Sequence, residues 1–188
     1  MLFLLVGIII SGCSEKQNKE PYCLSADDKA LLRDGDIILR RGEGMLSSII
    51  VRNLNDTVDA SHCGIIIKRG DSLDVIHCLS SEVSETDGVQ ICSLDEFTNE
   101  SVPGSISVVR CRKDSTNCLS ESAEYYLNVG KQFDKQFDMN DSTKFFCSEM
   151  ILRILNDRLG IDMITDNPQP KFSLFFNHDY FDVIFKNH

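Results

Sequence analysis

Three side chains of this sequence are suited to nucleophilic catalysis: Cys147 and the two histidines His62 and His77. Cys147 stands at the start of an apolar helical pattern over residues 145–159. The positive end of a helix dipole favours the thiolate, which is the reactive form of cysteine. Backbone N–H groups at such a helix start can also hold the oxyanion of a tetrahedral intermediate. A cysteine on an apolar helix face is more often a core residue, so both interpretations of Cys147 stay open.

The two histidines lie on neighbouring stretches of strand-like sequence. Residues 62–68 and 73–78 are apolar and are separated by the turn-forming tetrapeptide Arg-Gly-Asp-Ser at 69–72, which predicts an antiparallel hairpin. With a turn centred near residue 70, His62 and His77 are cross-strand neighbours within about one residue of register. One imidazole can then take the thiol proton while the other orients it and fixes its tautomer. Each histidine alone is more often a hydrogen-bonded, half-buried structural residue.

A cysteine follows each histidine, as His62-Cys63 and His77-Cys78. Adjacent side chains on a strand point to opposite faces, so one metal ion cannot collect all four. The sequence also contains no C-x-x-C spacing, which weakens a structural zinc interpretation. We therefore expect no metal site and no cofactor.

The rest of the sequence predicts the elements that must position these residues. Residues 36–39 read as a short buried strand, and residues 45–54 place apolar side chains at helical spacing. Residues 89–92 and 106–110 are further strand candidates, and residues 120–129 predict a helix that ends at a glycine. Because strands cluster before the helices, we expect an α+β fold with an antiparallel sheet.

The order of these motifs resembles that of the permuted papain-like, NlpC-type cysteine peptidases and amidases, in their YiiX-like branch. The motifs are Gly35-Asp36-Ile37-Ile38-Leu39, Ser61-His62-Cys63-Gly64-Ile65-Ile66, Val75-Ile76-His77 and Phe146-Cys147-Ser148-Glu149-Met150. The resemblance implies a circularly permuted papain-like α+β fold. In that fold an antiparallel sheet or barrel packs against helices, and the nucleophile opens a helix.

Carried over position by position, the resemblance implies that Cys147 is the nucleophile and His62 the general base and then acid. His77 takes the place of the third, orienting residue, where permuted relatives often have a carboxylate. Asp134 lies in the motif Gly130-Lys131-Gln132-Phe133-Asp134 upstream of the cysteine. It is a candidate for binding a substrate amine, although a solvated carboxylate is the commoner outcome.

The N-terminus resembles that of a bacterial lipoprotein. The apolar run over residues 2–10 is too short to span a bilayer as a helix but fits a secretory signal, and Ser11-Gly12-Cys13 resembles a lipobox. We predict a lipoprotein signal peptide over 1–12, a lipidated tether over 13–22 with Cys13 as the acylated residue, and a hydrolase domain over 23–188. The expected location is the bacterial cell envelope, and the outer membrane is favoured because Ser14, and not an acidic residue, directly follows the cysteine. A buried N-terminal strand is the alternative.

The charge composition of the chain argues against one class of function. The formal net charge is −10, from 19 basic and 29 acidic residues, which argues against nucleic-acid binding. We expect a cysteine hydrolase that cleaves an amide bond in a cell-wall peptide, such as a peptidoglycan-derived one, or in a small acyl-amino-acid. A lipid-directed thiol acyltransferase or thioesterase, and a non-catalytic envelope-binding lipoprotein, are the alternatives. An apolar tunnel beside Cys147 would favour lipid chemistry, and a short polar cleft would favour peptides.

Overall fold

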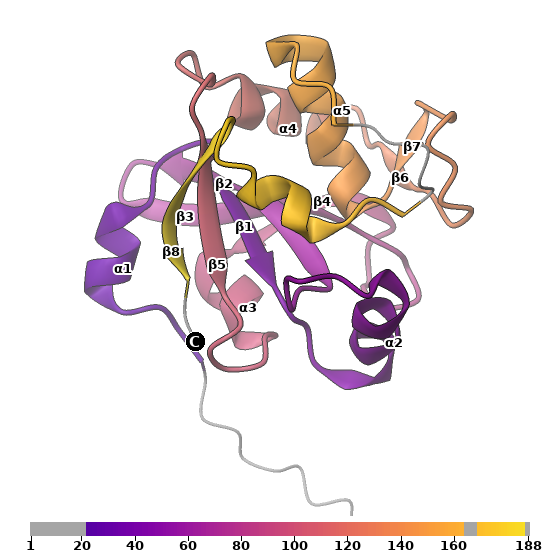
Figure 1. The fold of residues 1–188 in the computed structure, drawn as a ribbon, viewed down its shortest axis with the longest axis horizontal. Coiled ribbons are helices and arrows are strands. Elements are labelled where there is room, and N and C mark those ends of the chain that lie inside the picture. Colours follow the sequence, from indigo (N-terminus) through magenta and orange to yellow (C-terminus); the bar gives the residue numbers. More distant parts are fainter. Residues whose placement is uncertain (1–21, 164–168, 187–188) are drawn as a thin grey trace, which may run out of the picture.

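The computed structural model describes residues 22–163 and 169–186 (Figure 1). The predicted signal peptide and the predicted lipidation at Cys13 lie outside these residues, as does nearly all of the predicted tether. Among the described residues, no helix has both the length and the apolar character that a membrane crossing requires.

Helices and strands follow one another along the described residues as expected for an α+β chain. In order they are α1 (Ala26–Leu31), β1 (Ile37–Arg40), α2 (Gly44–Leu54), β2 (His62–Arg69), β3 (Ser72–Leu79), β4 (Gly88–Ser93), α3 (Leu94–Asn99), β5 (Ser107–Cys111), α4 (Cys118–Asn128), β6 (Gln132–Phe133), β7 (Lys144–Phe145), α5 (Cys147–Leu159), the 3-10 helix η1 (Phe172–Phe176) and β8 (Phe181–Lys186). The strands predicted at 36–39 and 62–78 and the helices predicted at 45–54, 120–129 and 145–159 are all present.

The main sheet is antiparallel throughout and has the strand order β4-β3-β2-β1-β5-β8. Strands β4 and β8 are its two edges in the described part of the chain, so the sheet is open and does not close into a barrel. A short parallel pairing of β6 with β7 lies just before α5 and leads the chain into that helix.

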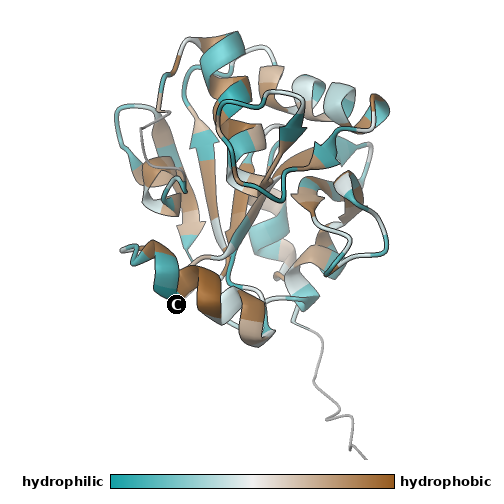
Figure 2. Cartoon of the chain, turned by 90° about the vertical axis from the view of Figure 1, so that its right-hand side faces the viewer, coloured by the Kyte–Doolittle hydropathy of each residue, from teal (hydrophilic) through white to brown (hydrophobic). Residues whose placement is uncertain are grey.

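The sheet separates two apolar layers. Helices α4, α5 and η1 pack on one face (Figure 1). Helix α3 packs on the other face, together with Leu24 and Leu32, which flank α1. Side chains of β2 alternate between the layers: Ile65 belongs to the α5 side and Ile66 to the α3 side. Figure 2 shows the hydrophobic residues concentrated along the central strands. Because the sheet is covered on both faces, its central strands contain continuous apolar runs, residues 37–39 in β1 and 65–67 in β2.

Candidate active site

Cys147 is the first residue of α5, and the residue before it, Phe146, is extended with φ −99° and ψ 172°. The side chain of Phe146, the residue before the helix, makes no capping hydrogen bond to the first turn, and Glu149 reaches back to accept from the Phe146 N–H at 3.4 Å. Asp138 and Asp141, upstream of the helix, accept N–H bonds from Asn140 and Thr143 within their own loop. The N–H groups of the first turn of α5 therefore face the site without a capping side chain.

The sulfur of Cys147 lies among hydrogen-bond donors. A hydrogen bond from the Cys63 thiol lowers the pKa of Cys147, and the backbone N–H groups of Cys63, Ser148 and Cys147 itself act in the same direction, while burial opposes them. Burial and the neighbouring Cys147 raise the pKa of Cys63 well above its ordinary value. Burial likewise raises the pKa of Cys78, whose thiol donates to the Phe145 carbonyl at 3.0 Å. Of these three thiols, Cys147 loses its proton most readily.

The two imidazoles are in direct contact. His62 Nε2 lies 2.9 Å from His77 Nδ1, and the ring centroids are 5.1 Å apart in an edge-on arrangement. His77 pairs with Gly64, not with His62, so the two histidines are offset by two residues on one face of the hairpin. The expected offset of about one residue was wrong, because the turn is centred between Gly70 and Asp71. An odd offset would have placed the rings on opposite faces.

Gly64 lets the two histidine strands approach closely. A Cβ atom at this position would lie 2.5 Å from Val75 Cγ1 and 2.9 Å from the Ile76 carbonyl oxygen. Any side chain there would push β3 away from β2, and His77 would move with it. The glycine that follows His62-Cys63 in the sequence is therefore part of how the histidine pair is built.

The histidine pair rests on Phe97 of α3, with ring centroids 5.7 Å away for His62 and 5.5 Å for His77. The guanidinium carbon of Arg40 lies over the same Phe97 ring, 4.4 Å from its centroid. Burial, and after it the Arg40 charge, lowers the pKa of His77 to about 3. The same causes lower the pKa of His62 well below its ordinary value. Both rings are therefore neutral at neutral pH.

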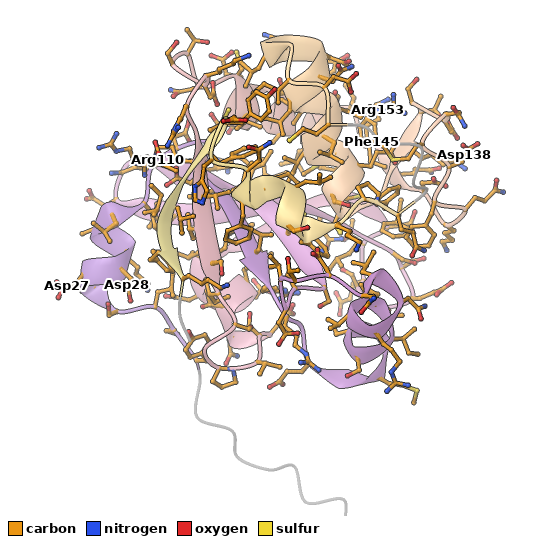
Figure 3. All side chains as sticks on the ribbon, in the orientation of Figure 1. Asp27, Asp28, Arg110, Asp138, Phe145 and Arg153 are labelled. Carbon is orange, nitrogen blue, oxygen red and sulfur yellow. The ribbon has the colours of Figure 1, made fainter. Side chains whose placement is uncertain are left out.

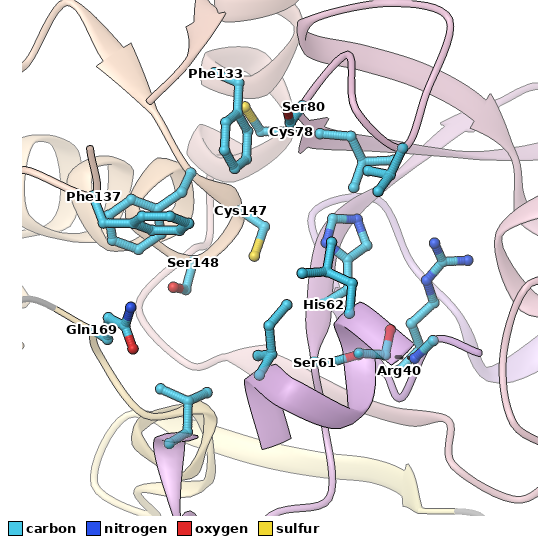
Figure 4. Close-up of a pocket in the computed structure, with 18 of the residues that line it drawn as sticks. Arg40, Ser61, His62, Cys78, Ser80, Phe133, Phe137, Cys147, Ser148 and Gln169 are labelled. Atoms are coloured by element: carbon cyan, nitrogen blue, oxygen red, sulfur yellow. Dashed lines mark hydrogen bonds between the residues drawn. The ribbon is translucent and has the colours of Figure 1, made fainter. Parts of the chain in front are cut away.

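A pocket of about 570 Å³ opens where β1, β2 and β3 meet the start of α5. Figure 4 shows Cys147 and His62 facing one another across it. Within the described residues no hydrogen bond joins the two side chains, which leaves room between them for a reacting group. The wall is mostly apolar and includes Leu46, Ile50, Leu54, Leu79, Val83, Phe133, Phe137, Phe146 and Phe172.

The ends of the strands bring together groups from both faces of the sheet. Cys63 and Cys78 belong to the α5 layer, whereas His62 and His77 contact Phe97 in the α3 layer. His62 is the first residue of β2, so its ring reaches the pocket at the sheet margin. This explains how a cysteine on one side of the sheet comes to face a histidine on the other.

Asp134 does not lie at the site in the way the sequence suggested. Its carboxylate is buried and accepts backbone N–H bonds from Gln136 at 2.9 Å and Asp138 at 2.5 Å. Its neighbours Phe133 and Phe137 line the pocket, and Asp134 does not. Figure 3 shows Asp138 at the outer margin of this loop. The geometry makes Asp134 an organiser of the loop, so a role in binding a substrate amine has no support.

Comparison with known proteins identifies the family. The family model described as permuted papain-like amidase enzyme, YaeF/YiiX, C92 family matches residues 31–174. The chain belongs to this family. The crystal structure of metalloprotein yiiX from Escherichia coli O157:H7 shares the fold, with a TM-score of 0.65 and 19% identity over 82% of this chain and 97% of that one. No curated protein matches the chain.

The yiiX structure is described as that of a metalloprotein, so the metal-binding capacity of this member of the family bears on the site. No group of three or more His, Cys, Asp or Glu side chains in the described part of the chain is placed to hold a metal ion. The histidines cannot share a metal ion with their neighbours Cys63 and Cys78, because these cysteines lie in the opposite layer. The described residues of this site therefore do not fit a metal ion.

Two residues of the site, Arg40 and Phe97, were not predicted from the sequence. Arg40 is separated from His62 by α2 and its flanking loops, and only the pairing of β1 with β2 sets Arg40 opposite His62. Phe97 lies on a short helix between strands and carries no chemical signal of its own. Cys63 was noticed as a neighbour of His62, but its contact with Cys147 follows only from the packing of α5 on β2.

Proposed function

We propose that the protein is a cysteine amidase or peptidase that uses Cys147 as nucleophile, His62 as general base and acid, and His77 to orient His62. The observation that carries the proposal is the placement of Cys147 and His62 on facing sides of one pocket (Figure 4). The lowered pKa of Cys147 supports the role of nucleophile. The family to which the chain belongs supports amide chemistry.

The first half of the reaction forms an acyl-enzyme. Neutral His62 takes the Cys147 thiol proton, and the sulfur attacks the amide carbonyl carbon to form a C–S bond. The carbonyl oxygen becomes negative and is held by N–H groups at the uncapped start of α5. As the intermediate collapses, the C–N bond breaks and the imidazolium returns its proton to the departing amine.

The second half hydrolyses the thioester. His62, neutral again, takes a proton from water, and the hydroxide attacks the same carbonyl carbon. The C–S bond then breaks, the carboxylic acid leaves, and the sulfur recovers the proton from His62. One water is consumed and both protein side chains return to their starting state.

His77 fixes the tautomer of His62 that these reaction steps require. If His62 donates from Nε2 to His77 Nδ1, its Nδ1 keeps a lone pair for the thiol proton. His77 must then carry its own proton on Nε2, which is buried without a hydrogen-bond partner in the described residues. The surroundings of Arg40 and Phe97 keep His77 uncharged, so that it accepts this hydrogen bond.

The substrate class follows from the pocket wall. A small acyl-amino-acid or an envelope peptide with an apolar group fits a pocket that is polar at Cys147 and His62 and apolar beyond them. The same apolar wall favours the second candidate, transfer or hydrolysis of a fatty acyl group carried on Cys147. With lipidation at Cys13, we propose attachment to the cell envelope, at the outer membrane; nucleic acid is not among the proposed partners.

The test uses fluorogenic amides that carry either an acetyl or a decanoyl group on the same amino acid. Turnover by the wild type, loss of turnover in Cys147→Ala, and an intact-mass increase equal to the acyl group would support the proposal. The variant Cys23→Ala is the control, because Cys23 is exposed and distant in sequence from the pocket residues. Retention of turnover in Cys147→Ala would contradict it. Acyl transfer to an added amine in preference to water would favour the lipid acyltransferase candidate.

A further inference from the structure

Helix α2 carries its apolar residues on the outside of the molecule. Exposed fractions are 79% for Met45, 50% for Leu46 and 43% for Ile49, and no residue of α2 is buried. The sequence pattern at 45–54 is that of a helix that packs one face on a core. In the described structure only the C-terminal end of that face packs on the core, through Leu54. Met45, Leu46 and Ile49 stay exposed, so they are available to another surface.

Two more exposed apolar side chains stand near the same pocket. Val83 is 51% exposed and Phe137 is 38% exposed. Leu46, Val83 and Phe137 also line the pocket that holds Cys147. We call Met45, Leu46, Ile49, Val83 and Phe137 the apolar rim. Exposed apolar patches that continue into a binding pocket are typical of surfaces that meet an apolar partner.

We propose that the apolar rim docks on a phospholipid surface and presents the mouth of the Cys147 pocket to it, so that an amphiphilic substrate enters directly from the lipid. The proposal rests on the proposed function, because it assigns that same pocket a substrate with an apolar chain. Continuity of the rim with the apolar wall is its first support: Leu46, Val83 and Phe137 belong to both, although the charged residues Glu43, Glu82 and Lys135 also line the pocket.

The length of chain outside the structure is the second support. If Cys13 is lipidated as proposed, about nine residues join the anchor to Tyr22, and they reach at most about 30 Å. The domain would stay close to the lipid surface, where weak contacts by a few side chains suffice to orient it.

Charge on α2 is compatible with a zwitterionic surface. Arg52 is exposed on the last turn and has no ion pair in the described residues, so it can meet lipid phosphate. Glu43 is exposed at the other end of the helix. The net charge of −10 opposes strongly anionic membranes, so phosphatidylcholine is the appropriate probe.

The test exploits the absence of tryptophan from the chain. Met45→Trp places a single indole on the rim, and Tyr125→Trp places one on α4, where Tyr125 is 61% exposed and far from α2 (Figure 1). The full chain is bound to phosphatidylcholine vesicles with bromine on the acyl chains. We expect quenching and a blue shift for Met45→Trp and neither for Tyr125→Trp.

Three results would overturn the proposal. These are no quenching of either variant, equal quenching of both, and a protein-concentration-dependent blue shift of Met45→Trp without vesicles. The last would show that a second copy covers the rim. Quenching needs no turnover, so the same measurement in a Cys147→Ala background separates failure of docking from failure of the proposed hydrolysis. Met45 does not line the pocket, so its substitution leaves the reacting groups untouched.

Discussion

His62 Nε2 lies 2.9 Å from His77 Nδ1, and both rings are almost completely shielded from solvent. This contact occupies one nitrogen of His62 and leaves only Nδ1 to serve a reacting group. It also explains why the third member of the site can be a histidine. A neutral imidazole accepts one hydrogen bond as a carboxylate does, without placing a second charge beside Arg40.

Thiol reactivity tests the assignment of Cys147. We expect iodoacetamide at pH 6–7 to label Cys147 about tenfold faster than exposed Cys23, because the lowered pKa of Cys147 gives it more thiolate. In His62→Ala this advantage should become smaller because the proton acceptor is lost, but it should not vanish, because the Cys63 thiol and the backbone N–H groups that lower the pKa remain. Peptide mass spectrometry after timed quenching measures each rate. Uniform labelling of the seven described cysteines would remove the basis for Cys147 as nucleophile.

The histidine pair should make stability depend on pH. Burial lowers the pKa of folded His77 from 6.5 to about 3, so between these values the unfolded chain binds a proton that the folded chain does not. The free energy of unfolding therefore falls as the pH is lowered below 6.5, by up to about 1.4 kcal/mol per pH unit for this group. In His77→Gln this contribution is absent. Urea unfolding at pH 6.5 and 4.5 should show the wild type losing about 2 kcal/mol more than the variant.

Glu149 makes the free energy of unfolding change with pH in the direction opposite to His77, and it serves as an internal check. Burial raises its pKa to about 7, so the folded chain holds a proton that the unfolded chain releases, and stability falls as the pH rises from 4.5 to 7. Because the wild type and His77→Gln both carry Glu149, its effect cancels when their stabilities are compared. Parallel pH profiles for the wild type and His77→Gln would show that His77 titrates normally in the folded protein.

Arg40 should set the acid limit of activity. Burial and, after it, the Arg40 charge lower the pKa of His62, so Arg40→Met should move the acidic limb of the kcat/KM profile to higher pH. Arg41→Met is the matched control, because Arg41 pairs with Asp59 at 3.0 Å and is partly exposed. An unchanged acidic limb in Arg40→Met would mean that His62 is not the group that titrates there.

Gly64 should be intolerant of a side chain. In Gly64→Ala the new methyl would press on Val75 and the Ile76 carbonyl, and the free energy of unfolding should fall by about 1–3 kcal/mol. Turnover should fall further than stability explains, because His77 shifts with β3. Ile66→Val, on the same strand and buried, is the control and should cost about 1 kcal/mol with turnover retained. Equal turnover in the two variants would refute a special role for Gly64.

Local patterns were sufficient to predict most elements of this protein. The apolar spacing over 145–159 and the glycine at 160 predicted α5, and the turn at 69–72 predicted the hairpin that carries both histidines. The motif order around His62, His77 and Cys147 was sufficient to predict the permuted papain-like family. These features could be read because each depends on residues a few positions apart, where backbone propensity and side-chain periodicity act directly.

Interactions between distant segments were decided only by the tertiary structure. Whether Asp134 met a substrate or its own loop depended on where the chain turned after β6, and whether Cys63 touched Cys147 depended on the packing of α5 on β2. The outward-facing apolar side of α2 has the same origin, since the periodicity at 45–54 specifies an amphipathic helix but not the surface that covers it. Burial, close approach and the electrostatic effect of Arg40 on the histidines all arise from such long-range packing, so no local sequence pattern contains them.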